Sequence, residues 1–168
     1  GRAVIILAGD IGGTKSALGL FELERVDTTR SAPAPIVQRT YPSREFPGLL
    51  PILQKFLAEV RPAVPVATAC FGVAGPVIEN RCETSNLPWV IEASALADTL
   101  DLPRVDLIND LEANAWGIGA LGPSDFAVLQ AGRAGANGNG AVLSAGTGLG
   151  QAGLYWDGRL HRPFASEG

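Results

Sequence analysis

The most informative segment of this chain is LAGDIGGTKSALGLFE, residues 7–22. An apolar run leads into a glycine loop that carries Asp10, Thr14 and Lys15, and a second, alternating apolar run follows the loop. This order predicts a strand, a polar turn and another strand. Glycines let backbone N–H groups approach an anion closely, and successive N–H groups form an anion-binding nest. The sequence therefore predicts a hairpin that grips phosphate, with Asp10 placed to bind an accompanying metal ion.

This loop is not a Walker A motif. Thr14 stands between Gly13 and Lys15, whereas the pattern GxxxxGK[ST] needs the second glycine and the lysine to be adjacent. The two-residue period after the loop also suits a strand, and a Walker loop opens a helix. A tight turn without a ligand is the alternative for this stretch taken alone, because glycine-rich turns are common.

Length and composition limit the classes of partner. The chain has 168 residues, a length that suits one domain, or one domain and part of another. Its net charge is −4. We expect no nucleic-acid partner, because there is no basic patch. We expect no membrane partner, because no apolar run approaches the roughly 20 residues that cross a bilayer. Cys70 and Cys82 have no nearby histidine, which argues against zinc and favours reduced thiols in a cytoplasmic protein.

Hydrophobic periodicity predicts strands and helices along the rest of the chain. Apolar positions spaced i, i+3, i+4 and i+7 predict an amphipathic helix over residues 46–61, which Pro62 ends. Strands are expected over residues 3–8, 17–23, 36–41, 65–73, 77–82, 105–108, 142–145 and 152–156. Two further helices are expected over residues 92–100 and 111–121. Loops are expected over residues 25–35 and 134–140, and a hairpin turn at residues 157–158. This mixture of hairpins and crossover helices indicates an α/β fold.

The opening hairpin has an echo later in the chain, AVLSAGTGLGQAGLYWD at residues 141–157. Each copy has an apolar strand that ends in Ala–Gly, a glycine loop with a threonine, and an outgoing apolar strand. Gly148, Gly150 and Gly153 spell GxGxxG, but a strand is expected where the dinucleotide motif needs a helix. Two such hairpins predict a duplicated architecture with nucleotide between its halves. A turn without a ligand is the alternative for the second loop alone.

Asn109 and Asp110 follow the strand expected over residues 105–108. Ligands of open α/β sheets collect at the carboxyl ends of strands. A carboxylate there can accept the proton of a substrate hydroxyl while that oxygen attacks phosphorus. Both residues are also good N-caps for a helix that begins at Leu111, which is the competing interpretation. Their coexistence with two phosphate-type hairpins favours the catalytic role.

Together these segments resemble the bacterial glucokinases of the hexokinase/actin-like superfamily. The matching segments are GDIGGTK (9–15), FGVAGPV (71–77), SNLPW (85–89), LINDLEANAWGI (107–118), SAGTGLG (144–150) and SEG (166–168). The resemblance implies an actin-like, ribonuclease H-like α/β domain with a mixed sheet and flanking helices, plus the beginning of a second, similar domain. We assign residues 1–108 to the small domain and residues 109–168 to the start of the large one.

The resemblance also implies the activity and its residues. It implies ATP-dependent phosphorylation of glucose to glucose 6-phosphate, the first step of glycolysis, with Asp110 as the catalytic base. The implied sugar ligands are Asn86, Asn109, Asp110 and Glu167; the first phosphate loop is Gly9, Asp10, Ile11, Gly12, Gly13, Thr14 and Lys15, and the second is Gly146, Thr147 and Gly148. Magnesium would bridge the ATP phosphates near Asp10.

Two features depart from the pattern of the family. Many glucokinases have asparagine where this chain has Lys15, a side chain that either adds charge near the phosphates or faces solvent. The family's chains are also much longer. We therefore expect an N-terminal fragment that is inactive alone, with an exposed apolar face on its second domain, from a protein that is a homodimer when full length. A non-catalytic sugar-sensing regulator, a kinase for another hexose, and another actin-like ATPase are the alternative functions.

Overall fold

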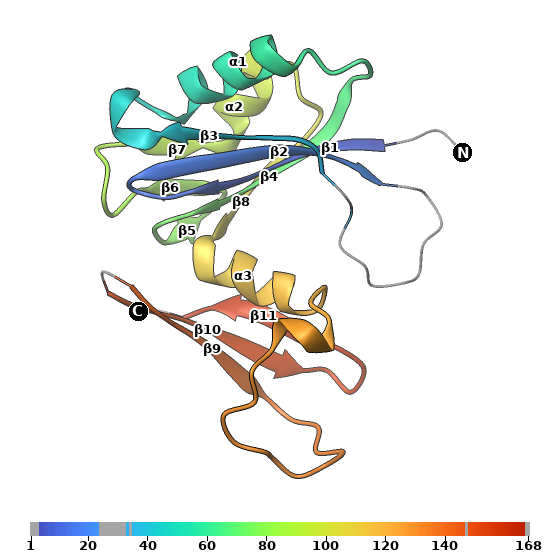
Figure 1. Ribbon diagram of the computed structural model, residues 1–168. Helices are drawn as coiled ribbons and strands as arrows, with labels where there is room; N and C mark the ends of the chain where they lie inside the picture. The colour runs from blue at the N-terminus through green and yellow to red at the C-terminus, as the bar shows by residue number, and fades with distance from the viewer. Residues whose placement is uncertain (1–3, 24–32, 34, 147, 167–168) are drawn as a thin grey trace. The chain divides into compact units, whose positions relative to one another are not determined.

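The computed structural model describes residues 4–23, 33, 35–146 and 148–166, which form two compact units. Unit 1 contains the described residues up to Asp110, and unit 2 contains those from Leu111 onward. Both units combine helix and sheet in the ribbon diagram (Figure 1). The assignment of residues 1–108 and 109–168 to two family domains stays a prediction.

A five-stranded mixed sheet forms the centre of unit 1, in the order β3-β2-β1-β4-β8. Its strands are β1 (Val4–Ile11), β2 (Lys15–Leu23), β3 (Pro35–Pro42), β4 (Val66–Val73) and β8 (Val105–Asn109). The first three are antiparallel neighbours, whereas β1, β4 and β8 are parallel. The register pairs Asp10 with Gly72 and Val73 with Asn109. The carboxyl ends of the three parallel strands therefore meet at one edge of the sheet.

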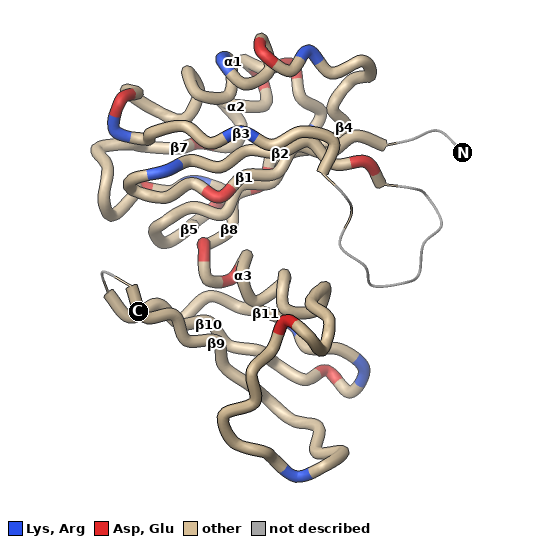
Figure 2. The backbone as a smooth tube through the Cα atoms, viewed as in Figure 1, with Lys and Arg blue, Asp and Glu red and all other residues tan. Residues whose placement is uncertain are grey.

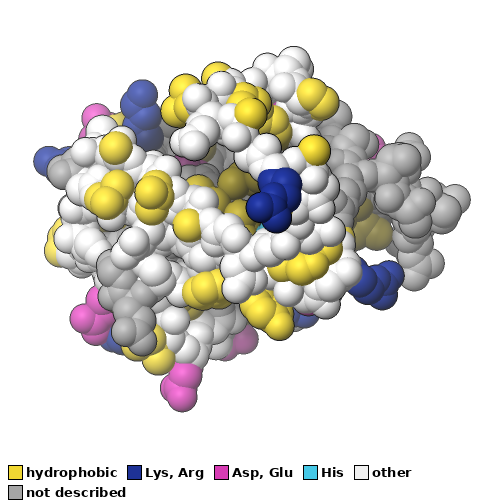
Figure 3. Space-filling model, turned by 90° about the horizontal axis from the view of Figure 1, so that it is seen from below, with side chains coloured by type: hydrophobic (Ala, Val, Ile, Leu, Met, Phe, Trp, Pro, Cys, Tyr) yellow, Lys and Arg dark blue, Asp and Glu magenta, His cyan; other side chains and the backbone are white. Residues whose placement is uncertain are grey.

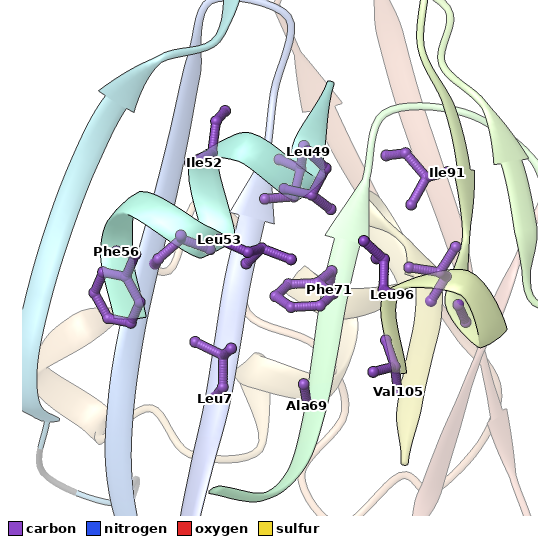
Figure 4. Close-up of a cluster of buried hydrophobic side chains, with 14 of the residues drawn as sticks. Leu7, Leu49, Ile52, Leu53, Phe56, Ala69, Phe71, Ile91, Leu96 and Val105 are labelled. Carbon is purple, nitrogen blue, oxygen red and sulfur yellow. The ribbon is translucent and has the colours of Figure 1, made fainter. Parts of the chain in front are cut away.

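Helices α1 (Leu49–Val60) and α2 (Ala93–Leu100) lie over the same face of this sheet (Figure 1). The buried residues of α1 follow the spacing that predicted the helix: Leu49, Ile52, Leu53 and Phe56. Figure 4 shows this row beside Leu7 and Phe71 of the sheet, with Leu96 of α2 farther along. Leu7, Phe56 and Phe71 are at most 1% exposed. Burial of these apolar side chains is the main force that holds unit 1 together.

A small second sheet of unit 1 corrects one sequence prediction. Its strands are β5 (Val77–Ile78), β6 (Arg81–Glu83) and β7 (Val90–Glu92), in the order β5-β6-β7. The single strand predicted over residues 77–82 is wrong, because the chain reverses at Glu79 and Asn80, where φ is +51° and +60°. No glycine marks this turn in the sequence. The predictions also missed β7.

Unit 2 consists of α3 (Asp110–Ile118, its first residue in unit 1), a 3₁₀ turn η2 (Pro123–Asp125), and the antiparallel sheet β11-β10-β9. Its strands are β9 (Gly140–Ala145), β10 (Leu149–Trp156) and β11 (His161–Ala165). The predicted turn at Asp157–Gly158 is confirmed, with Gly158 at φ +93°. The predicted helix over residues 111–121 ends earlier, before Gly119, and β11 was not predicted. The expected loop over residues 25–35 falls mainly outside the described residues.

Unit 2 buries little apolar surface. Among its described residues, the buried hydrophobic side chains are Ala115 and Ala152. Larger apolar side chains are about half exposed or more, namely Trp116, Leu121, Phe126, Val128, Leu129, Leu143, Leu149, Tyr155 and Phe164. Figure 3 shows hydrophobic side chains gathered on the molecular surface. The exposed apolar surface expected for the second part of the chain is therefore present.

Charge is dispersed over the surface. Figure 2 shows acidic and basic positions interspersed along unit 1. The ion pair between Lys55 and Glu59 on α1 is partly exposed. The pair between Arg104 and Asp106 at the start of β8 is also partly exposed. Exposed pairs of this kind contribute little to stability, because water and salt screen them. Across the described ranges, no helix has the length and apolar character that crossing a bilayer requires.

A tyrosine–carboxylate hydrogen bond ties β3 to α1. The Tyr41 hydroxyl donates to Glu59 Oε2 at 2.6 Å, and Tyr41 is 6% exposed. Burial, followed by the hydrogen bond to the Glu59 carboxylate, raises the pKa of Tyr41 to about 12. The neutral phenol is therefore the form that the fold stabilises.

We expect the free energy of unfolding to fall as the pH rises from about 10, the pKa of an unfolded tyrosine, to about 12, because the unfolded chain loses the phenolic proton first. Denaturant unfolding across this range measures the fall, and Tyr41→Phe should remove the part of it that Tyr41 causes. Tyr155 is 55% exposed, so Tyr155→Phe is the matched control and should retain the fall. A Tyr41→Phe protein with the wild-type pH dependence would contradict the assignment.

Candidate active site

The β1–β2 hairpin has the strand–turn–strand form that the sequence predicted. The two strands pair from Val4 and Leu23 down to Ile11 and Ser16, and Gly12 N donates to Lys15 O at 2.9 Å across the tip. The Ile11 side chain is 1% exposed and anchors the hairpin in the core. Thr14 and Lys15 are exposed at the tip. The tip is therefore well placed to meet a ligand, although its binding of phosphate stays a prediction.

Two buried serines brace this tip. Ser16 on β2 and Ser43 in the 3₁₀ turn η1 (Ser43–Glu45) are both 0% exposed, and their Oγ atoms lie 2.8 Å apart. Ser43 Oγ donates to Gly12 O at 2.7 Å. Since a serine has one hydroxyl proton, Ser16 is the donor in the serine pair. Ser43 N also donates to Thr14 O at 3.0 Å, so η1 holds both sides of the tip.

The tip also meets the loop that carries Asn86. A Cβ atom on Gly13 would lie 2.7 Å from Asn86 Cβ, so only glycine allows this approach. Thr84 Oγ1 donates to Leu87 O at 2.8 Å and the Trp89 side chain is 3% exposed, which together fix the shape of the loop. The structure thus brings a predicted phosphate-loop residue and a predicted sugar ligand into contact.

Asn109 and Asp110 lie at the same sheet edge as Asp10. The backbones of Asp10 and Ile108 both pair with Gly72 of β4, so they are two strand spacings apart, roughly 10 Å. Asn109 Nδ2 donates to Gly75 O at 3.0 Å, in the turn after β4. This bond orients Asn109 at the end of β8, directly before Asp110.

The negative charge of Asp110 acts on two side chains at this end of the sheet. Asp10 is exposed as a whole residue, but partial desolvation of its carboxylate and, second, the negative charge of Asp110 raise its pKa above the ordinary value. Burial and the charge of Asp110 also raise the pKa of the Cys82 thiol, which keeps this buried cysteine protonated. Cys70 is only partly buried. Asp110 therefore projects a negative potential onto the residues around it.

The two carboxylates suit a magnesium ion brought in with nucleotide phosphates. Mg²⁺ in such sites takes one or two carboxylates and completes its octahedron with water and phosphate oxygens. A cation bound at Asp10 would offset the negative charge of Asp110, which is the second cause, after desolvation, of the raised pKa of Asp10. Within the part of the chain that the structure describes, no three His, Cys, Asp or Glu side chains cluster as a metal cage.

Gly9 has a packing role inside β1. A Cβ atom there would lie 2.7 Å from Leu18 and 2.8 Å from Phe71, two buried core side chains. Gly9 and Asp10 also line a shallow cavity of about 300 Å³ with residues of β2 and β3. A larger open cavity, of about 490 Å³, lies around Asn80 and the amino end of β8, at the opposite end of that strand from Asp110.

The second predicted phosphate loop lies between β9 and β10 of unit 2. These strands form an antiparallel hairpin, and Gly146 N donates to Gly148 O at 2.8 Å. Thr147 and Glu167 lie outside the described residues. The loop is followed by the strand β10 and not by a helix, which confirms that GxGxxG here is not the dinucleotide motif. Gly150 and Gly153 serve packing, since a Cβ atom there would clash with Leu111 and Phe164 respectively.

The sequence analysis missed two residues at the hairpin tip. Ser43 and Arg44 come from η1, and Arg44 Nε donates to Gly13 O at 3.4 Å, which adds a cation to the tip beside Lys15. Local pattern gave no signal for either residue, because Ser43 is 27 residues from Ser16 in the chain.

The fold is that of the sugar kinases of the actin-like superfamily. The chain has a TM-score of 0.82, at 29% identity, to the glucokinase from an Antarctic psychrotroph, over 99% of this chain and 51% of that one. The ROK family glucokinase from Streptomyces griseus, in complex with glucose and AMPPNP, has a TM-score of 0.64 at 22% identity, over 96% and 48%. The predicted fold class is therefore confirmed.

Sequence comparison then identifies the family. A family model described as Glucokinase matches residues 7–168, so the chain belongs to the glucokinase family. It is 44% identical over 170 residues to a glucokinase of Synechocystis sp., covering 98% of this chain and 48% of that protein. A glucokinase of Nostoc sp. is 39% identical, with coverages of 98% and 47%. The chain spans about half the length of the curated relatives it matches.

We expect Ser43→Ala to lower the free energy of unfolding by about 1–3 kcal/mol, because it leaves Gly12 O and the Ser16 hydroxyl without their buried partner. Denaturant unfolding measures the loss. In a double-mutant cycle, Ser16→Ala combined with Ser43→Ala should cost less than the sum of the single changes, since the two hydroxyls share one bond. Ser94 is exposed on α2, so Ser94→Ala should cause no loss. Additive effects of the serine pair would contradict the brace.

Proposed function

We propose that the full-length protein transfers the γ-phosphoryl group of ATP to the 6-hydroxyl of glucose. The observation that carries this proposal is the arrangement of Asp10, the Gly12–Gly13 tip and Asn109–Asp110 along one sheet edge, in a chain of the glucokinase family. Phosphoryl transfer needs positioned phosphates, charge neutralisation and a carboxylate near the attacking hydroxyl. These residues supply all three requirements.

Asp110 acts as the general base. Its carboxylate accepts the proton of the 6-hydroxyl while that oxygen forms a bond to the γ-phosphorus of ATP, and the bond from phosphorus to the β,γ-bridging oxygen breaks as ADP leaves. The orienting bond from Asn109 Nδ2 to Gly75 O holds the neighbouring residue in place. Asn109 and Asn86, with Glu167, bind the other sugar hydroxyls and so fix the geometry of attack.

The hairpin tips hold the phosphates. The N–H groups of Gly12 and Gly146 close their own turns, so the other backbone N–H groups of the Gly12–Thr14 and Gly146–Gly148 loops donate to phosphate oxygens. Lys15 adds positive charge beside the first tip. Asp10 would hold the magnesium ion, which neutralises the charge that develops on the phosphates. Both cysteines are free thiols, which supports the cytoplasm as the place of action. We also propose that the full-length protein is a homodimer.

We expect the full-length protein to consume ATP in a glucose-dependent way, and Asp110→Asn and Asp110→Ala to lower kcat by about 10²–10⁴-fold, because a general base contributes about that factor. A coupled assay of glucose 6-phosphate measures both effects. Asp106 lies on the same strand and pairs with Arg104 away from this edge, so Asp106→Asn is the matched control and should keep near-normal kcat.

Each part of the proposal has its own contradicting result. Near-normal phosphoryl transfer by both Asp110 variants would remove this residue as the base. Much faster phosphorylation of fructose, mannose or an N-acetyl sugar would replace glucose as the substrate. ATP hydrolysis that no sugar changes would point to another actin-like ATPase, and DNA binding by a protein without kinase activity would point to a regulator.

A further inference from the structure

Asn80 occupies an unusual position in the β5–β6 hairpin. Ile78 pairs with Arg81, so Glu79 and Asn80 are the two central residues of the turn, with φ of +51° and +60°. Two positive φ values match a type I′ turn, in which asparagine is favoured and glutamate is not. The turn places the half-buried Asn80 side chain against β8.

The carboxamide of Asn80 pairs with the backbone of β8. Asn80 Nδ2 donates to Val105 O at 3.0 Å, and Leu107 N donates to Asn80 Oδ1 at 2.6 Å. A carbonyl and the N–H two residues later are the groups that one residue of a neighbouring parallel strand would take. Since β8 is the last strand in the order β3-β2-β1-β4-β8, the Asn80 side chain stands where a sixth strand would begin.

Other contacts hold Asn80 itself and the end of β8. Ala93 N, at the start of α2, donates to Asn80 O at 3.1 Å. On its other edge β8 pairs with β4 through Val73 and Asn109, and Asn109 Nδ2 reaches Gly75 O. Hydrogen bonds thus hold β8 along both of its long sides over the residues that precede Asp110.

We propose that Asn80 is a positioning residue for the catalytic base: its side-chain clamp on Val105 and Leu107 sets the path of β8 and so the placement of Asn109 and Asp110. This inference rests on the proposed function, in which Asp110 is the base. Asn80 itself touches no reacting atom. A displacement of the base by about 1 Å is enough to lower the rate by about 100-fold, so a small shift of β8 has a large effect.

The first test is Asn80→Gly in the full-length protein, because glycine keeps the positive φ of the turn and removes only the carboxamide. We expect kcat to fall by about 10–100-fold, while KM for ATP stays within about twofold, because the hairpin tip at Gly12–Gly13 is built from other strands. Glu79→Gly is the matched control. It relaxes the neighbouring positive φ, leaves the two hydrogen bonds between Asn80 and β8 in place, and should keep wild-type kcat and KM. Wild-type kcat in Asn80→Gly overturns the proposal.

The second test is Asn80→Asp, which preserves the shape of the side chain. Its carboxylate still accepts from Leu107 N but repels Val105 O, whereas its protonated form can donate to Val105 O. The ratio of variant to wild-type kcat should therefore rise as the pH falls from about 8 toward the ordinary aspartate pKa of about 4. The other charged groups around this position are unchanged in the variant, namely Glu79, Arg81, Glu92, Arg104 and Asp106. A ratio independent of pH overturns the proposal.

Amide exchange separates this inference from the proposed function. In Asn80→Gly the Leu107 N–H loses its acceptor, so its hydrogen exchange should accelerate by about 10-fold or more, which NMR or mass spectrometry measures without any activity. Unchanged exchange at Leu107 overturns the clamp. A wild-type protein that phosphorylates no hexose overturns the proposed function instead, and does so whatever the exchange result.

Discussion

The parallel register of β1, β4 and β8 is the constraint on which the candidate site depends. Asp10 and Ile108 share Gly72 as their pairing partner, so the carboxyl ends of the strands stay level. A shift of one residue would turn Asp10 to the other face of the sheet and place Leu7 and Ile11 outside the core. The core that covers one face of the sheet therefore specifies the same register that the chemistry needs.

The features that could be predicted from sequence are those with a local signal. The β1–β2 and β9–β10 hairpins combine alternating apolar residues with glycines in the loop, and both formed where expected. The α1 helix has its apolar residues at helical spacing and a proline after its end. Asn109 and Asp110 were placed at a strand end by a short buried run before them. Each of these signals lies within about 15 neighbouring residues, the range over which periodicity is informative.

The features that could not be predicted depend on contacts between distant residues. Ser16 and Ser43 look like ordinary polar residues of a strand and a turn, and only the folded sheet buries them together. The reversal at Glu79–Asn80 lacks the Asn–Gly or Asp–Gly pair that usually marks such a turn. The clamp of Asn80 on β8 joins residues 25 and 27 positions apart. A single sequence carries no signal for pairings of this kind.

The buried serine pair also has a thermodynamic consequence for ligand binding. Gly12 and Thr14 each have a carbonyl held by Ser43, so the tip is ordered before any phosphate arrives. A flexible glycine loop would lose about 1–2 kcal/mol of backbone conformational entropy per residue on closing around an anion. A preorganised loop loses little further conformational entropy on binding, so more of the interaction energy contributes to affinity. In this hairpin the glycines lose their conformational entropy when the protein folds, so phosphate binds to a loop that is already ordered.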